Sequence, residues 1–252
     1  MSTQWAVITG ASAGIGADFA RLFAADGCPL VLVARRRERL EELAATLPVE
    51  TRICAADLAT AEGVAALIAF LDEQGIEPHH LVNNAGFGLR GAFAELDPTA
   101  MHDMIRLNVL ALTDLTRRYL PAMLARGSGG VLNVASLAGF QPGPNMAVYY
   151  ATKAFVLHMT EAIAQEIKGR GVTMNAFCPG PVATEFNDVA GLGKPAAFGF
   201  WTMSSPRAAQ IGYRAYRKGK VLCVPGVVPP IARFLNWITP RPWSRALLAR
   251  LQ

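Results

Sequence analysis

The sequence predicts an α/β fold built on a doubly wound parallel sheet of about seven strands, with helices on both faces. Short apolar runs rich in β-branched residues alternate along the chain with amphipathic helical patterns, and turn residues separate them. The apolar runs are continuous, which is typical of parallel strands buried on both faces. We expect strands at residues 5–9, 30–34, 51–55, 81–84, 131–136, 172–178 and 221–224.

The composition favours a single domain over residues 1–252. Apolar residues make up 52% of the chain and charged residues 17%, which allows a sizeable core. Glycine and proline are scattered between the apolar runs and do not gather into a linker. The net charge of +5 comes from dispersed arginines, with Arg35-Arg36-Arg37 as the one tight basic run. A nucleic-acid surface is therefore a poor explanation of the charge, and an anionic cofactor is a better one.

The cysteines and the start of the chain favour a cytoplasmic protein. Cys28, Cys54, Cys178 and Cys223 lie far apart in apolar stretches and lack metal-ligand spacing, so we expect reduced, buried thiols. The first expected strand begins within five residues of the start, which leaves no room for a signal segment. Since no run of about 18 apolar residues occurs, we expect no membrane-spanning helix.

The first expected strand runs into a glycine-rich turn. Gly10, Gly14 and Gly16 let the backbone turn tightly and approach a ligand closely before the next helix begins, and Ser12 and Ile15 lie between them. The start of a helix offers unpaired N–H groups and a partial positive charge, so a phosphate is its natural occupant. The turn therefore predicts a dinucleotide pyrophosphate site, although its Gly-x-x-x-Gly-x-Gly spacing differs from the common fingerprint.

The end of the second expected strand distinguishes the two nicotinamide cofactors. A carboxylate there would bind the adenosine ribose hydroxyls of NAD. This chain instead has Arg35, nineteen residues after Gly16, and then Arg36. Because a guanidinium can hold a phosphate through two hydrogen bonds, the 2′-phosphate of NADP is the favoured ligand and NAD the less favoured cofactor. We expect Arg35 to make this contact, with Arg36 as a helper or a solvated charge and Ser12 adding a hydroxyl.

Tyr149 and Lys153 indicate redox chemistry. They are four residues apart in an expected helix, so they share a face and the ammonium can lie beneath the phenol. A nearby positive charge lowers a phenol pKa from its usual value of about 10, and such a tyrosine can act as an acid near neutrality. Tyr150 is a rival phenol, because a residue three before Lys153 also fits helical geometry.

These residues, together with Asn83-Asn84-Ala85-Gly86, Asn108, Ser136 and Pro179-Gly180, follow an order that resembles the short-chain dehydrogenase/reductase family of the compact, single-domain type. The resemblance extends from residue 9 to about residue 184. It implies a Rossmann-type sheet with strand order 3-2-1-4-5-6-7, where ligands bind at the carboxyl edge of the strands. It also implies an NADP(H)-dependent oxidoreductase that interconverts a carbonyl and an alcohol by hydride transfer.

The same resemblance implies roles for the matching residues. Ser136 and Tyr149 would hold the carbonyl oxygen, and Tyr149 would deliver the proton. Lys153 would also bind the nicotinamide ribose, and Asn108 would hold a water that leads toward Lys153. The implied cofactor-binding residues are Gly10, Ser12, Gly14, Ile15, Gly16, Arg35, Asp57, Asn84, Ala85, Gly86, Tyr149, Lys153, Pro179, Gly180 and Thr184.

Several of these assignments have an ordinary structural alternative. Asp57 would contact the adenine or serve as the N-cap of the next helix. Asn108 would otherwise be a helix-surface amide, and the turn at Pro179, with Thr184, would either hold the nicotinamide carboxamide or simply be rigid. The histidines lack partner ligands in the sequence, so no metal is assigned.

Residues 185–205 differ from the rest, because aromatic and apolar residues are interleaved with glycines there. We interpret this segment as a substrate lid, since a loop of this length in a compact domain is usually functional or disordered and its aromatic content argues against disorder. An irregular packing segment or a subunit contact is the alternative. An apolar lid predicts a hydrophobic ketone, aldehyde or acyl substrate.

Residues 226–252 form an amphipathic, basic C-terminal segment, for which subunit packing is favoured over peripheral contact with a membrane surface. The helices that hold Asn108 and Tyr149 form dimer contacts in many relatives, so the resemblance implies a homodimer or homotetramer. A nonenzymatic NADP-binding regulatory protein is the rival function. Such a protein would be free to lose the reactive residues, whereas this chain keeps all four of them, which favours an enzyme. They are Asn108, Ser136, Tyr149 and Lys153. A sugar-nucleotide epimerase or dehydratase usually needs a larger C-terminal domain than remains after residue 184.

Overall fold

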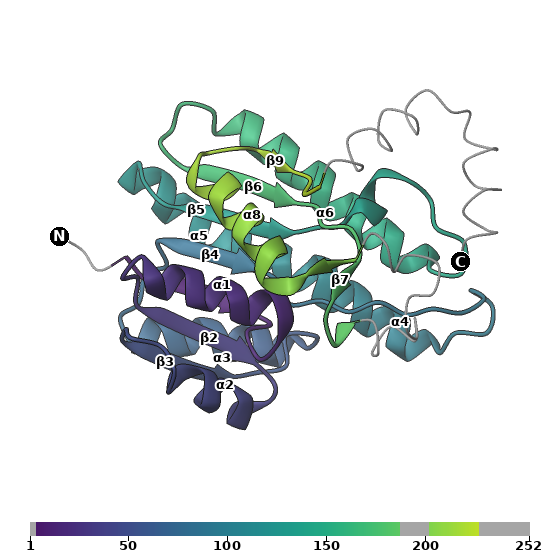
Figure 1. Cartoon of the computed structure of the whole chain (residues 1–252), viewed down its shortest axis with the longest axis horizontal. Helices are drawn as coiled ribbons and strands as arrows, with labels where there is room; N and C mark the ends of the chain where they lie inside the picture. The colour runs from purple at the N-terminus through teal and green to yellow at the C-terminus, as the bar shows by residue number, and fades with distance from the viewer. Residues whose placement is uncertain (1–3, 187–201, 227–252) are drawn as a thin grey trace.

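The computed structural model describes residues 4–186 and 202–226 and contains a seven-stranded parallel sheet (Figure 1). The sheet has the order β3-β2-β1-β4-β5-β6-β9, which confirms the predicted 3-2-1-4-5-6-7 arrangement. The winding reverses between β1 and β4, so a crevice for ligands is expected at their carboxyl ends. The strands are β1 Ala6–Thr9, β2 Leu30–Ala34, β3 Thr51–Ala55, β4 His80–Asn83, β5 Gly130–Val134, β6 Thr173–Phe177 and β9 Leu222–Cys223.

Helices cover both faces of this sheet. In Figure 1, α1 (Gly14–Ala25) and α8 (Ser205–Arg217) lie in front of the strands, and they share a core with α2 (Arg37–Ala44). The opposite core contains side chains of α3 (Ala61–Glu73), α5 (Leu112–Arg126) and α6 (Ala147–Glu166). The strand side chains alternate between the two cores, as Ile8 packs in the first and Val7 in the second. Continuous apolar strands are therefore required, because each residue of a central strand meets one helix layer or the other.

Some predicted strand boundaries were wrong by one or two residues. Strand β5 ends at Val134, and Ser136 instead begins a 3-10 helix, Leu137–Phe140, by accepting a hydrogen bond from Ala138 N at 3.1 Å. Strand β4 begins at His80, which is buried and hydrogen-bonded to the Tyr216 hydroxyl at 2.7 Å. Sequence patterns could not show this bond, because the two residues are 136 positions apart.

The last residues of the segment 185–205, which we interpret from its sequence as a lid, belong to regular structure. A pair of two-residue strands, β7 (Val182–Ala183) and β8 (Met203–Ser204), brackets it, and Met203 N donates to Pro181 O at 3.0 Å. Ser205 is buried and begins α8. Of the proposed lid, residues 187–201 lie outside the described residues, as do residues 227–252 of the predicted C-terminal segment.

The long helical region after β4 contains a π-helical segment around Asn108. It begins with α4 (Pro98–Ile105), which Asp97 caps through hydrogen bonds from Thr99 N and Ala100 N. A π-helical segment, Arg106–Ala111, then leads into α5. Such segments widen the helix by one residue per turn and often occur at functional sites. Here the wide turn carries Asn108, which is 1% exposed.

Two further expectations concern the cysteine thiols and membrane-spanning helices. Cys28, Cys54, Cys178 and Cys223 are free and buried, as predicted. None of the helices within residues 4–186 and 202–226 combines the length and apolar character needed to cross a membrane.

Candidate active site

The glycine-rich turn has the backbone that its sequence predicts. Gly10 and Gly14 adopt φ angles of +66° and +54°, a left-handed conformation that residues with a Cβ rarely take. A Cβ on Gly16 would lie 2.3 Å from the carbonyl oxygen of Gly10, so the third position also requires glycine. Helix α1 begins at Gly14 with no side-chain cap, and its first turn holds no acidic residue. The first N–H groups of α1 thus form a cradle that suits a pyrophosphate.

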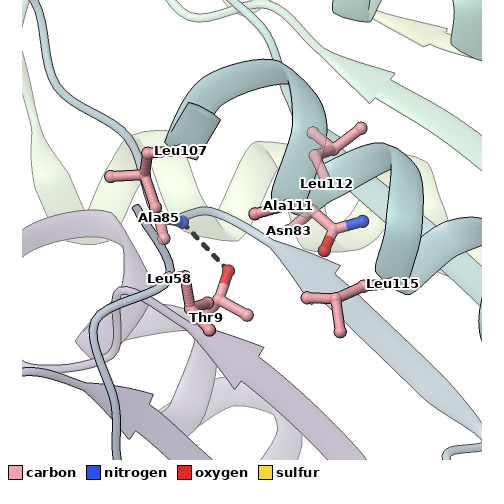
Figure 2. Close-up of a pocket in the computed structure, with 8 residues that line it drawn as sticks. All are labelled: Thr9, Leu58, Asn83, Ala85, Leu107, Ala111, Leu112 and Leu115. Atoms are coloured by element: carbon pink, nitrogen blue, oxygen red, sulfur yellow. Dashed lines mark hydrogen bonds between the residues drawn. The ribbon is translucent and has the colours of Figure 1, made fainter. Parts of the chain in front are cut away.

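The turns after β1 and β4 are tied together by Thr9. Its hydroxyl accepts hydrogen bonds from Asn84 N and Ala85 N, both at 3.0 Å, and the latter is drawn in Figure 2. The side-chain amide of Asn84 donates to the carbonyl oxygens of Thr9 and Gly10 at 3.0 and 3.1 Å. A small cavity lies beneath this junction, and Leu107 and Leu115 are among the residues that line it (Figure 2). Asn84 thus positions the glycine-rich turn, whatever its contact with a cofactor.

Two arginines flank the end of β2 on different sides. Arg35 lies 3.8 Å from the Asp57 carboxylate, with a side chain that is 75% exposed. Arg36 Nη2 donates to the Ser12 hydroxyl of the glycine-rich turn at 3.2 Å. Asp57 is not the N-cap of α3, because Thr60 has that role; Asp57 instead accepts from Ala59 N at 3.0 Å. Ser12, Asp57 and both arginines therefore gather at the carboxyl ends of the first three strands.

The turn after β6 reaches back to the glycine-rich turn. Leu137 N donates to Pro179 O at 2.9 Å, which places this turn beside Ser136, and a Cβ on Gly180 would meet Leu137 at 3.1 Å. Thr184 lies over Gly14, because a Cβ there would be 2.9 Å from Thr184 Cγ2.

Tyr149 and Lys153 project from α6 into the interior at the edge of β5. The side chains belong to residues that are 8% and 5% exposed. Lys153 Nζ donates to Val134 O at 2.8 Å and lies 5.9 Å from the centre of the Tyr149 ring. The two groups are therefore near one another, and both face the end of β5, as the helical spacing predicts.

The pKa of Tyr149 differs from the sequence expectation. Burial raises it to about 12, although a hydrogen bond with Ser136 lowers it in part. Burial also lowers the pKa of Lys153 to about 8. The expectation of an acidified phenol was wrong because desolvation of the phenolate is the largest effect on this pKa, while the Lys153 ammonium donates its hydrogen bond to Val134 O.

The rival Tyr150 faces elsewhere. Its ring lies against the backbone at Gly143, where an added Cβ would be 2.4 Å from the ring. Tyr149 is the phenol that bonds with Ser136 and lies near Lys153.

Asn108 forms a buried link between the helices and the turn after β4. Its amide donates to Phe87 O at 2.9 Å and to the Thr152 hydroxyl at 3.1 Å, and its oxygen accepts from Phe87 N at 3.1 Å. Gly86 lies between Asn108 and Lys153, since a Cβ there would be 2.9 Å from Asn108 Oδ1 and 3.5 Å from Lys153 Nζ. The helix-surface alternative for Asn108 was therefore wrong.

Apolar side chains surround the Tyr149 ring. Phe186 lies 5.4 Å from it between ring centres. Met146 belongs to the same cluster, and Phe87 and Leu89 pack against it. A carbonyl beside Tyr149 would thus meet hydrocarbon on most sides.

Four residues of the site were missed by sequence reasoning. Thr9 and Thr152 bond with predicted residues, and the position of Thr152 three residues after Tyr149 was a usable signal. Arg39 and Glu185 form an ion pair at 2.7 Å, and Arg36 bonds the same carboxylate at 2.9 Å. The hydrogen bonds from Arg36 and Arg39 lower the pKa of Glu185. No local pattern could reveal that contact, because Glu185 is 146 residues beyond Arg39.

Comparison with known proteins gives consistent matches. A family model described as short chain dehydrogenase matches residues 4–193. A very-long-chain 3-oxoacyl-CoA reductase from Anas platyrhynchos is 33% identical over 195 residues, covering 74% of this chain and 62% of that protein. The chain thus spans less than two thirds of that relative. A sulfoacetaldehyde reductase from Chromohalobacter salexigens is 39% identical over 199 residues, covering 77% of this chain and 79% of that protein.

Among solved structures, a short-chain dehydrogenase from Sphingobium yanoikuyae in complex with NADPH has a TM-score of 0.81. It is 31% identical, and the match covers 98% of this chain and 95% of that one.

Proposed function

The chain belongs to the short chain dehydrogenase family, and from that premise we propose that it is an NADP(H)-dependent oxidoreductase that interconverts a carbonyl and an alcohol. The observation that carries this proposal is the position of Ser136, Tyr149 and Lys153 beside one another at the carboxyl edge of the sheet, next to a phosphate-binding turn. Reductases of a 3-oxoacyl-CoA and of an aldehyde among the relatives support a carbonyl substrate.

The cofactor fits the residues that would hold it. The α1 cradle would take the pyrophosphate, and Gly86 leaves room next to Lys153 that a Cβ would fill. Arg35 and Arg36 would take the 2′-phosphate, and Arg36 also bonds Ser12 of the glycine-rich turn. The NADPH complex of the Sphingobium protein supports this preference over NAD. When bound, NADPH supplies the hydride.

The chain itself supplies the proton and the orientation. Ser136 and Tyr149 would donate hydrogen bonds to the substrate oxygen, and those bonds strengthen as negative charge develops on it. A phenol whose pKa is about 12 is protonated at neutral pH, so Tyr149 holds its proton, as a neutral phenol, before the reaction. It can still transfer that proton, because an alkoxide is a stronger base than a phenolate.

Lys153 and Asn108 would support this transfer. The ammonium of Lys153 is held at the end of β5 by Val134 O, where it can bind a ribose hydroxyl and stabilise a phenolate on Tyr149. Asn108 fixes the Gly86 turn through Phe87 and would hold the water that resupplies the proton.

The proposed substrate is a hydrophobic ketone, aldehyde or acyl derivative. Phe186, Met146 and Phe87 around Tyr149 support it, since burying an apolar group against them is favourable. The names of the two relatives span a very long acyl chain and a short sulfonated aldehyde, so family membership alone does not choose between these classes.

A panel of carbonyl compounds followed at the reduced-nicotinamide absorbance tests the function. We expect oxidation of NADPH with long-chain or bulky apolar carbonyls, slower turnover with NADH, and little with sugars. Preference for polar substrates would contradict the substrate class, and no turnover with any carbonyl would contradict the enzyme.

We also propose a homodimer formed through α5 and α6. Exposed apolar side chains on and beside these helices support it, namely Leu110 at 52% and Phe155 at 43%, next to an apolar groove lined by Phe93, Ile105 and Val148. Sedimentation equilibrium should give at least twice the chain mass of 26.9 kDa, and a Leu110→Glu variant should shift the equilibrium toward monomer. A wild-type monomer at micromolar concentration would contradict this.

A further inference from the structure

Glu185 is an exposed carboxylate held by two arginines from another part of the chain. Its two oxygens accept hydrogen bonds from Arg36 Nη2 at 2.9 Å and Arg39 Nη1 at 2.7 Å. Both arginines follow β2, one directly before α2 and one within it. The same Arg36 nitrogen also donates to Ser12 in the glycine-rich turn. The carboxylate therefore lies where the chain presents positive charge beside its dinucleotide cradle.

A phosphate would compete for the same donors. A guanidinium binds carboxylate and phosphate through the same planar pair of N–H groups, so both anions cannot use those N–H groups fully at once. A phosphate monoester carries up to two negative charges and three acceptor oxygens, against one charge and two oxygens for the carboxylate. The Glu185 side chain is 45% exposed, so its ion pairs are weak and can be displaced.

The residues on both sides of Glu185 contact other parts of the site. Thr184 lies over Gly14 of the glycine-rich turn, and the Phe186 ring is tilted against the Tyr149 ring with 5.4 Å between their centres. Three consecutive residues thus touch the pyrophosphate cradle, the arginine pair and the catalytic phenol. Since Glu185 and Phe186 are adjacent in the chain, a backbone shift that carries Glu185 off the arginines would also move Phe186 relative to Tyr149.

We propose that Glu185 is a cofactor-specificity residue whose carboxylate occupies Arg36 and Arg39 until the 2′-phosphate of NADP(H) displaces it and draws Phe186 away from Tyr149. This inference rests on the proposed function. NAD(H), which lacks the phosphate, leaves the carboxylate in place and the phenol covered. The chain thereby couples recognition of the phosphate to access to its catalytic residue.

Calorimetric titration with 2′,5′-ADP and with 5′-AMP tests the competition, because these nucleotides differ only in the 2′-phosphate and need no turnover. Glu185→Gln should tighten binding of 2′,5′-ADP by about two-fold to five-fold, since a weak exposed ion pair no longer competes. Binding of 5′-AMP should stay unchanged. Glu50→Gln is the matched control, because Glu50 is 53% exposed and pairs with Arg52 at 2.7 Å, and it should alter neither affinity.

Thiol labelling tests the movement. The four native cysteines are buried, so a Phe186→Cys variant adds one reactive position over a low background. Saturating 2′,5′-ADP should speed labelling by about two-fold to five-fold, in line with the strength of the contact it releases, and 5′-AMP should not. Adding Glu185→Gln should give fast labelling without nucleotide.

The outcomes separate the inference from the function on which it rests. Equal effects of Glu185→Gln on the two nucleotides, or weaker binding of 2′,5′-ADP, would overturn the competition. Unchanged labelling at saturating 2′,5′-ADP would overturn the movement. Failure of the wild-type protein to bind either nucleotide would overturn the proposed function, and the inference with it.

Discussion

The proposed adenosine end and the proposed catalytic end of the site differ in how exposed their charged and polar side chains are. At the adenosine end, the side chains of Arg35, Arg36 and Asp57 are 75%, 46% and 43% exposed and form ion pairs at the surface. At the catalytic end, Tyr149 and Lys153 are 8% and 5% exposed. Exposed charges can discriminate between anions but are screened by solvent and salt. Buried groups interact strongly, and their pKa values shift far from the usual ones.

This contrast predicts different consequences of substitution at each end. Changes at the catalytic end should remove chemistry or alter the pH dependence of stability. Changes at the adenosine end should alter affinity for one cofactor by a modest, salt-dependent factor.

The largest expected effect comes from Tyr149→Phe. Loss of the phenolic proton should lower kcat by about 1,000-fold, within the range that positioned acids contribute. The dissociation constant for NADPH should change less than about two-fold, because the ring and its packing against Phe186 remain.

Tyr150→Phe is the matched control for this variant, since the Tyr150 ring lies against Gly143. Steady-state rates and fluorescence titration with NADPH give both quantities. Substantial turnover by Tyr149→Phe, or its loss in Tyr150→Phe alone, would reverse the assignment of the two phenols.

The second effect is a pH-dependent stability difference at Lys153. Its pKa in the folded chain is about 8, against an ordinary value of 10.5, because burial penalises the ammonium. Below pH 8 the lysine is charged in both folded and unfolded chains, so the full cost of burying the ammonium lowers the free energy of unfolding. Between pH 8 and 10.5 the unfolded chain binds the proton and the folded chain does not, so this residue raises the free energy of unfolding as pH rises.

Lys153→Met lacks that contribution. The stability of Lys153→Met relative to wild type should therefore fall by up to about 3 kcal/mol between pH 7.5 and 10.5. Urea denaturation of both proteins at several pH values measures it, and the buried thiols and other tyrosines titrate in both and cancel. A difference independent of pH would show that the ammonium is not desolvated in the folded chain.

The sequence allowed most of the fold to be predicted and part of the site. The strand positions followed from continuous apolar runs, which a sequence displays directly. The strand order followed from the family resemblance, as did the choice of Ser136 with Tyr149 and Lys153, which the fold brings together.

The remaining features depend on contacts between distant segments. The pKa direction of Tyr149 is set by how completely Phe186 and its neighbours exclude water, and helical spacing carries no such information. The inward turn of Asn108 needs a π-helical segment that its local sequence does not mark. The contact of Glu185 with Arg36 joins residues 149 positions apart.

The smallest expected effect is on cofactor affinity, and it would show which of the two arginines after β2 binds the 2′-phosphate. The sequence favours Arg35 as the phosphate ligand, whereas Arg36 is the one bonded to Ser12 and to Glu185. Arg36→Ala should weaken NADPH binding by about ten-fold, roughly the strength of one charge-assisted hydrogen bond, and leave NADH binding unchanged. Arg52→Ala, another exposed arginine in an ion pair, is the control.

Titrations with both cofactors at low and high salt would separate the roles of Arg35 and Arg36. The effect of Arg36→Ala should shrink at high salt, because an exposed guanidinium is screened. If Arg35→Ala has the larger effect, the phosphate binds on the Asp57 side of the β2 end and Glu185 is no competitor for it. If Arg36→Ala does, the phosphate binds on the Ser12 side, where displacement of Glu185 is unavoidable. The two substitutions thus decide whether the exposed end of the site acts alone or is coupled through residues 184–186 to the buried end.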